Sequence, residues 1–147
     1  MPFPEFNYCL FCDIIRPELG GKFILLGFYG LAPNVNLSVP DINRHASLSI
    51  LAGSPPIDDT ITTYNCVVLI TRPDGIGVVQ TNPMRLAVSQ GKGVFLPVMF
   101  SIAPPILSGR YSVRITVNGE LKLDTSFSLH TGGTPEQNRP PAMGAQN

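Results

Sequence analysis

The dipeptide Asn118-Gly119 constrains the fold of this chain more than any other feature of its sequence. A type I′ turn needs positive φ at both central positions, and asparagine followed by glycine is a pair that adopts it readily. Apolar and polar residues alternate before the dipeptide, in Arg110–Val117, and after it, in Glu120–Leu129. The sequence therefore predicts a β-hairpin with one buried face. That face is expected to carry Tyr111, Val113, Ile115 and Val117 from the first strand and Leu121, Leu123, Phe127 and Leu129 from the second.

Turn signals recur at short intervals through the rest of the chain, and no stretch shows a convincing helical period. Examples are Gly20-Gly21, Pro73-Asp74-Gly75 and Asn82-Pro83, whose residues favour turns. Many short strands separated by such turns are typical of a β-sandwich or barrel. We therefore predict nine strands: Tyr8–Ile15, Lys22–Tyr29, Arg44–Leu51, Thr63–Arg72, Ile76–Thr81, Met84–Val88, Gly93–Ile102, Arg110–Val117 and Glu120–Leu129.

Some segments depart from this regular pattern. The stretch Gly30–Asn43 is expected to be a long loop. Pro97 lies inside the seventh predicted strand, and because proline cannot donate to a ladder, we expect that strand at a sheet edge or bulge. At 147 residues the chain is expected to be one domain. We expect the β-sandwich over residues 1–130 and a flexible C-terminal tail, rich in Gly, Pro, Gln and Asn, over residues 131–147.

Charge and hydropathy exclude several classes of partner and indicate a compartment. Ten basic and ten acidic residues give a formal net charge of zero, whereas a sequence-independent nucleic-acid binder needs an excess of cations. The same balance argues against an anionic membrane surface, and no apolar run is long enough to span a bilayer. The N-terminus lacks the features of a leader. Three cysteines, an odd number, fit a reducing cytoplasm better than secretion.

The cysteines are also the residues that most resemble a metal site. Cys9 and Cys12 have the spacing of a thiolate pair, with Cys66 as a third thiol. In a strand, however, residues three apart point to opposite faces, so the pair cannot hold one ion. A redox motif would need a helix N-terminus to lower the thiol pKa, and no helix is predicted. We therefore expect buried, inert thiols that form no disulfide and bind no metal.

The remaining candidates for chemistry are acidic residues and histidines. Glu18, Asp58 and Asp59 fall at one end of the predicted sandwich, but calcium needs six to eight oxygen ligands, so solvated loops are favoured. His45 lies on the polar face of its strand and His130 opens the tail. Neither accompanies a recognisable nucleophile motif, so both are expected to be surface residues. The sequence predicts no catalytic residue, no cofactor and no enzyme.

Two segments carry a resemblance to known proteins. The stretch from Leu10-Phe11-Cys12-Asp13-Ile14-Ile15 through Gly20–Tyr29 resembles the opening of a family of uncharacterised bacterial proteins with a domain-of-unknown-function label. The segment Gly109–Val113 resembles their C-terminal hairpin, and the likeness extends from Tyr8 to Leu129. The resemblance implies an immunoglobulin-like, antiparallel β-sandwich. It implies no activity and no catalytic residues.

The first predicted hairpin has apolar residues on both faces, unlike the last one. A two-layer sandwich covers only one face of each sheet, so the outer side of this hairpin is expected to be an exposed apolar patch. We expect Phe11, Phe23, Leu25 and Tyr29 to lie there and to bind a protein partner or a second copy of the chain. The alternative is that the loop Gly30–Asn43 or the tail folds back over the patch.

These patterns favour a protein–protein interaction or structural module over other classes of protein. A module that binds carbohydrate or calcium through loops at one end is the alternative. An exposed aromatic platform or a converging polar cleft would distinguish the two, and neither is evident in the sequence. An enzyme is the third and least favoured class.

Overall fold

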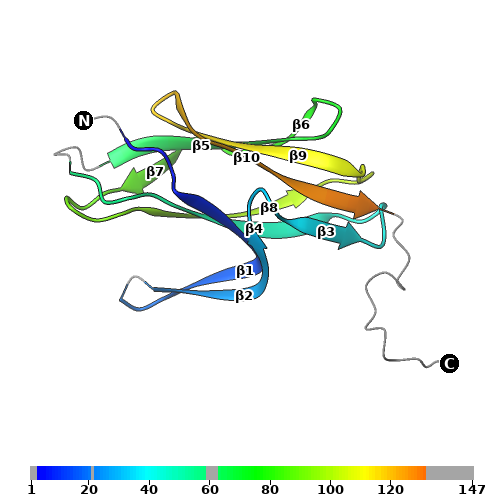
Figure 1. Cartoon of the computed structure of the whole chain (residues 1–147), viewed down its shortest axis with the longest axis horizontal. Coiled ribbons are helices and arrows are strands. Elements are labelled where there is room, and N and C mark those ends of the chain that lie inside the picture. The colour runs from blue at the N-terminus through cyan, green and yellow to red at the C-terminus, as the bar shows by residue number, and fades with distance from the viewer. Residues whose placement is uncertain (1–2, 21, 59–62, 132–147) are drawn as a thin grey trace.

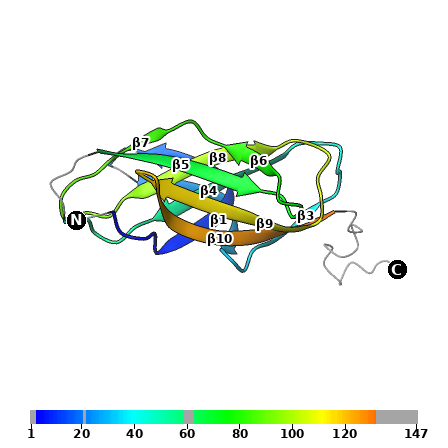
Figure 2. The same ribbon diagram turned by 90° about the horizontal axis from the view of Figure 1, so that it is seen from above.

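The computed structural model describes residues 3–20, 22–58 and 63–131, and within these residues it contains strands and no helix. Two sheets, one of four strands and one of six, pack against each other as a β-sandwich (Figure 1). Figure 2 shows the sandwich with the six-stranded sheet towards the viewer. The four-stranded sheet has the order β2 (Lys22–Leu31), β1 (Tyr8–Glu18), β4 (Ala46–Gly53) and β8 (Phe95–Ile102). The six-stranded sheet has the order β3 (Asn36–Val39), β10 (Glu120–Thr131), β9 (Gly109–Val117), β5 (Thr63–Thr71) and β6 (Gly77–Gln80), with β7 (Met84–Ala87) also paired to β5. The predicted all-β sandwich is confirmed.

The described residues form ten strands where the sequence predicts nine. The additional strand, β3, lies inside Gly30–Asn43, for which the sequence predicts a loop. It pairs in parallel with β10, with Leu37 opposite Leu129, so the six-stranded sheet is not purely antiparallel. The sequence does not reveal this strand, because it has only four residues and no hairpin turn joins it to its distant partner. The predicted loop instead carries the chain from the edge of one sheet to the edge of the other.

The hairpin of β9 and β10 follows the prediction closely. Asn118 has φ of 49° and Gly119 has φ of 82°, the positive values that a type I′ turn requires. One prediction fails here, because the register of β10 shifts between Leu121 and Leu123. This irregularity places Leu121 outward, with half of its surface exposed, instead of in the core.

Aromatic rings join the two sheets at the centre of the sandwich. Phe11 of β1 lies 4.8 Å from Phe127 of β10, measured between ring centroids, and both side chains are fully buried. Tyr111 of β9 stacks on Phe127 at 5.4 Å. Its hydroxyl donates a hydrogen bond of 2.8 Å to the Leu107 carbonyl oxygen, so the buried polar atom is satisfied. The sandwich core therefore includes β1 as fully as it includes the final hairpin.

Two further predictions concern the margins of the sandwich. The strand that contains Pro97, β8, lies at the edge of the four-stranded sheet, as predicted. The prediction that the tail begins at residue 131 is off by one, because Thr131 is the last residue of β10. The rest of the predicted tail, residues 132–147, lies outside the described residues.

Candidate partner-binding surface

Strand β1 changes its neighbours along its length. Residues Tyr8–Cys12 pair with β4 on one side, whereas Ile14–Glu18 pair with β2 alone. We call Asp13–Glu18 of β1 together with Lys22–Phe28 of β2 the arm. In Figure 1 the arm lies below the two layers of the sandwich, with β2 as its lowest strand. The N-terminal hairpin therefore adds a partial third layer.

One face of the arm packs onto the outside of the four-stranded sheet. Ile15 and Leu25 are opposite each other in the register, and Ile15 is buried. At the end of the arm, the ring of Phe23 meets the ring of Phe95 of β8 edge-on, with centroids 6.0 Å apart. A small hydrophobic cluster fills the space beneath the arm; it consists of Cys12, Ile15 and Leu51, with Leu10, Phe23 and Leu25 packed against it.

The base of the arm is held by contacts to Asp13. The Tyr29 hydroxyl donates a hydrogen bond to Asp13 Oδ1, and Ser49 Oγ of β4 donates one of 3.0 Å to the Asp13 carbonyl oxygen. Gly27 has φ of 68°, and a Cβ there would overlap the Asp13 carboxylate. The hydrogen bond to Asp13, together with burial and the negative charge of the carboxylate, raises the pKa of Tyr29 to about 12. These contacts fix the direction in which the arm leaves the sheet.

The other face of the arm is exposed and apolar. Ile14 and Leu26 are directly opposite each other, and Phe28, two residues after Leu26, is opposite Cys12. The exposed fractions of Ile14, Leu26 and Phe28 are 51%, 45% and 59%, respectively. Met99 of β8, 70% exposed, lines a groove of about 390 Å³ together with Ile14. We call Ile14, Leu26, Phe28 and Met99 the arm patch.

The charges near this patch balance one another. The arm contains two acidic residues, Asp13 and Glu18, and two basic residues, Arg16 and Lys22. Arg16 Nε lies 3.0 Å from Glu18 Oε2, so this pair is neutralised within the arm. From Phe23 to Leu31, β2 has no charged residue at all. Asp13 lines the groove beside Ile14, and Lys22 lies at the far end of the arm, so it is the arm as a whole that carries no net charge.

The structure separates the four residues that the sequence predicts at this surface. The placement of Phe11 on an exposed outer face is wrong, because it lies in the core between the two sheets. Phe23 and Leu25 are half-buried, since their face of the arm packs onto the sheet. Tyr29 is 44% exposed and binds Asp13 through its hydroxyl. Within the described residues, the predicted loop Gly30–Asn43 leads to the other sheet and is not the element that covers this hairpin.

The prediction missed the residues of the arm patch for a definite reason. Both faces of the hairpin are apolar in sequence, so the alternation does not tell which face is exposed. A register shift of the β1–β2 pairing between Phe11 and Cys12 changes the environment along β1. Gly27, with φ of 68°, also interrupts the regular alternation between Leu26 and Phe28, so the sequence pattern does not identify these residues.

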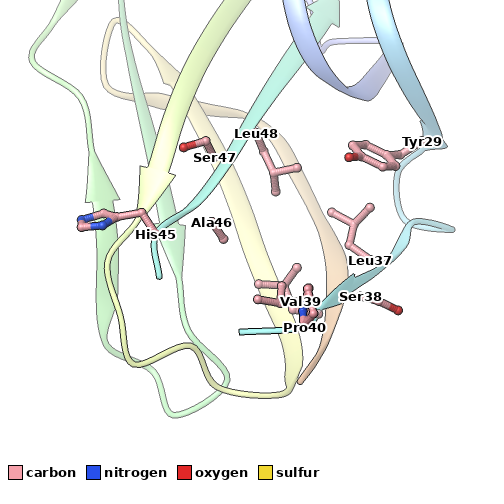
Figure 3. A pocket seen from close by; sticks show the side chains of 10 residues that line it. Tyr29, Leu37, Ser38, Val39, Pro40, His45, Ala46, Ser47 and Leu48 are labelled. Carbon is pink, nitrogen blue, oxygen red and sulfur yellow. The ribbon is translucent and has the colours of Figure 1, made fainter. Parts of the chain in front are cut away.

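A second concave site lies between the two sheets, where β1 has separated from β4 (Figure 3). This cavity of about 220 Å³ is lined mainly by apolar side chains, among them Leu37 and Val39 of β3 and Leu48 of β4. Figure 3 shows Tyr29 above these residues, and His45 and Ser47 on the other side of β4. Ligand-binding pockets usually have about 300–1,000 Å³, so this cavity is small for an organic ligand.

The three thiols are free and buried. Cys9 belongs to the main core, whereas Cys12 belongs to the cluster beneath the arm, so the predicted separation of this pair across the strand is confirmed. Burial raises the pKa of Cys9 and of Cys66 to about 12, and it also raises the pKa of Cys12. All three are protonated at neutral pH, which is the state of an unreactive thiol.

The other candidate groups lie apart from one another. His45 and His130 are both exposed, but neither lies where the sequence predicts: His45 precedes β4 instead of belonging to its strand, and His130 lies within β10 instead of opening the tail. Glu18 pairs with Arg16, and Asp58 Oδ1 accepts a 3.1 Å hydrogen bond from Gln90 Nε2. The third predicted acidic residue, at position 59, lies outside the described residues. No three His, Cys, Asp or Glu side chains of the described segments are grouped so that they would hold a metal ion.

Among the residues that the structure describes, no helix is long and apolar enough to cross a membrane.

Comparisons with known proteins add little to this picture. No protein-family model matches the sequence, and no curated protein matches it. Similar solved structures include the alkylpurine DNA glycosylase AlkC of Pseudomonas fluorescens, bound to DNA with an abasic site analogue, at 17% identity and a TM-score of 0.42. The match covers 67% of this chain but spans only 28% of the glycosylase chain. The C-terminal domain of Wzt matches at 16% identity and a TM-score of 0.41, over 89% of this chain and 75% of that one. At these TM-scores, neither likeness carries an argument about this protein.

Proposed function

We propose that this chain is a non-catalytic protein–protein interaction module, and that the arm patch is the surface through which it binds another protein chain. We further propose that its sandwich is immunoglobulin-like and that it works in a reducing bacterial cytoplasm. The free, unpaired thiols support the reducing compartment. The two packed, mostly antiparallel sheets support an immunoglobulin-like architecture.

The observation that carries the proposal is the exposure of the four residues of the arm patch. A large apolar side chain has on the order of 200 Å² of surface, so four such residues, each about half exposed, present on the order of 400 Å². This area lies in the range of the largest apolar patch on a typical monomer, about 300–600 Å², and such patches commonly mark interaction sites. The arm as a whole carries no excess of positive charge, which favours a protein surface over a nucleic acid or an anionic membrane.

The distribution of reactive groups supports the non-catalytic part of the proposal. Nucleophilic catalysis needs an activated nucleophile next to a base that a third group orients. The thiols are buried and their pKa values are raised, so none of the three is an activated nucleophile.

Site-specific photocrosslinking in the native host tests the proposed function. A photoreactive phenylalanine analogue in place of Phe28 should give a discrete adduct with a protein. The same analogue in place of Leu121, which is equally exposed but belongs to the six-stranded sheet, is the matched control and should give none. The proposal is wrong if position 28 gives no adduct, or if both positions give the same diffuse set.

A further inference from the structure

We propose that the partner of the arm patch is a second copy of this chain, which places its own arm patch face to face with the first about a two-fold axis. This inference rests on the proposed function, because it names the partner of the same surface. A two-fold interface brings the same patch of both copies together, so the patch must complement itself in charge, shape and size.

Charge complementarity favours a second copy. An apolar patch ringed by charges of one sign would repel its own copy and would fit an oppositely charged partner. The arm instead has two acidic and two basic residues, and Arg16 and Glu18 neutralise each other at 3.0 Å. The whole chain also has a formal net charge of zero, so two copies approach each other without net repulsion.

The position of the arm allows this contact. In Figure 1 it lies outside the two layers, and β2 forms the lower margin of the molecule. The contact of Phe23 to Phe95, and the hydrogen bond from Ser49 Oγ to the Asp13 carbonyl oxygen, fix the arm against the sheet. A surface that is already ordered loses little conformational entropy on binding, which favours association. The second copy therefore meets a preformed surface.

The size of the patch fits a small, specific interface. Two patches of on the order of 400 Å² would bury about 800 Å² of apolar surface. Apolar atoms supply about 56–65% of a typical interface, so the total area would be about 1,200–1,400 Å². Stable interfaces bury about 1,200–2,000 Å², which places this contact near the lower limit. We expect a concentration-dependent dimer with a dissociation constant on the order of micromolar.

Sedimentation velocity of the full chain over about 1 μM to 1 mM tests this inference. The wild type should shift from 15.9 kDa towards twice that mass as its concentration rises. The double variant Leu26→Ser/Phe28→Ser should dimerise on the order of 1,000-fold more weakly, because it removes apolar surface from both copies. The control double variant Ile76→Ser/Leu121→Ser loses side chains of similar exposure elsewhere and should dimerise like the wild type.

A charge swap at Met99 keeps the inference testable if the serine variants fold poorly. Met99 is the most exposed residue of the patch, so replacing it should leave the fold intact. Met99→Glu and Met99→Lys should each weaken self-association, since two like charges then face each other across the two-fold axis. An equimolar mixture of the two variants should associate more tightly than either alone, which is expected only if the partner is a second copy.

The outcomes separate this inference from the proposed function. A wild type that stays at 15.9 kDa up to the highest concentration refutes the second copy as partner. If the crosslinker at Phe28 then captures a different protein, the proposed function stands and the partner is not self. If it captures nothing, both proposals fail. A wild-type dimer that the arm variants and the control variants weaken equally also refutes the arm patch as its interface.

Discussion

Replacement of Phe11 by alanine tests the placement of this residue most directly. The side chain is fully buried, lies 4.8 Å from Phe127 across the sandwich, and stands opposite Ile50 in the register of β1 and β4. Truncation of such a residue removes its buried surface and leaves a cavity, which together cost about 3–5 kcal/mol of unfolding free energy. For a domain of this size, each kcal/mol lowers the melting temperature by about 3 °C, so the variant should melt about 10–15 °C lower.

Thermal unfolding followed by circular dichroism measures this loss, and Phe28→Ala is the matched control. Phe28 is the same residue type in the same hairpin but is 59% exposed. Its truncation should change the unfolding free energy by at most about 0.5 kcal/mol and the melting temperature by about 2 °C. Equal melting temperatures for the two variants would refute the assignment of Phe11 to the core and of Phe28 to the surface.

Three further predictions concern the arm and the thiols. Gly27→Ala should lower the free energy of unfolding by about 1–2 kcal/mol because of the left-handed backbone at this position, and by more because the new Cβ overlaps the Asp13 carboxylate. In thermal unfolding its melting temperature should therefore fall further than that of Gly119→Ala, whose new Cβ would meet no atom within 4 Å. The pKa of the Tyr29 phenol should be about 12, so the stabilisation from its hydrogen bond to Asp13 is complete below about pH 10 and is lost as the pH rises through 12. Absorbance titration of the wild type against Tyr29→Phe measures this pKa, and a value near 10 would contradict the hydrogen bond to Asp13. The buried thiols, with the pKa of Cys9 raised to about 12, should react slowly with an aromatic disulfide reagent at pH 8 in the native state, and three thiols per chain should react after unfolding. Fast reaction of the native protein would show that the thiols are accessible.

The elements that the sequence predicts well are those whose signals are local. The turn at Asn118-Gly119 fixes its own backbone geometry, and alternation on both sides of it fixes the buried face. Pro97 marks an edge strand because its missing donor is a property of the residue itself. Strand β3 was not foreseeable in the same way, since its parallel pairing with β10 depends on the packed sandwich and on no nearby turn.

The first hairpin shows where a correct observation led to the wrong residues. Apolar residues on both faces predict one buried and one exposed face along the whole hairpin, because a sandwich has two layers. In the structure Phe11 belongs to the part of β1 inside the sheet, whereas Phe23 belongs to the arm that lies outside it. The pairing of β1 with β4 ends at Cys12, and this change of neighbours leaves no clear mark in the alternation. Which face is exposed therefore depends on tertiary packing, and only the existence of an exposed apolar face could be predicted.

The double-sided pattern of the arm has two physical explanations, one for each face. The face with Ile15 and Leu25 is apolar because the arm needs an anchor on the sheet, and burial there supplies it. The same reason does not account for Leu26 and Phe28, which remain about half exposed. Within the described residues, these side chains stay in water on a strand that has no charge from Phe23 to Leu31. Edge strands usually carry charges or prolines that prevent association with other chains. From Phe23 to Leu31, the edge strand β2 has neither, and its other face is already packed on the sheet. Both features favour the proposed contact with a second copy of the chain.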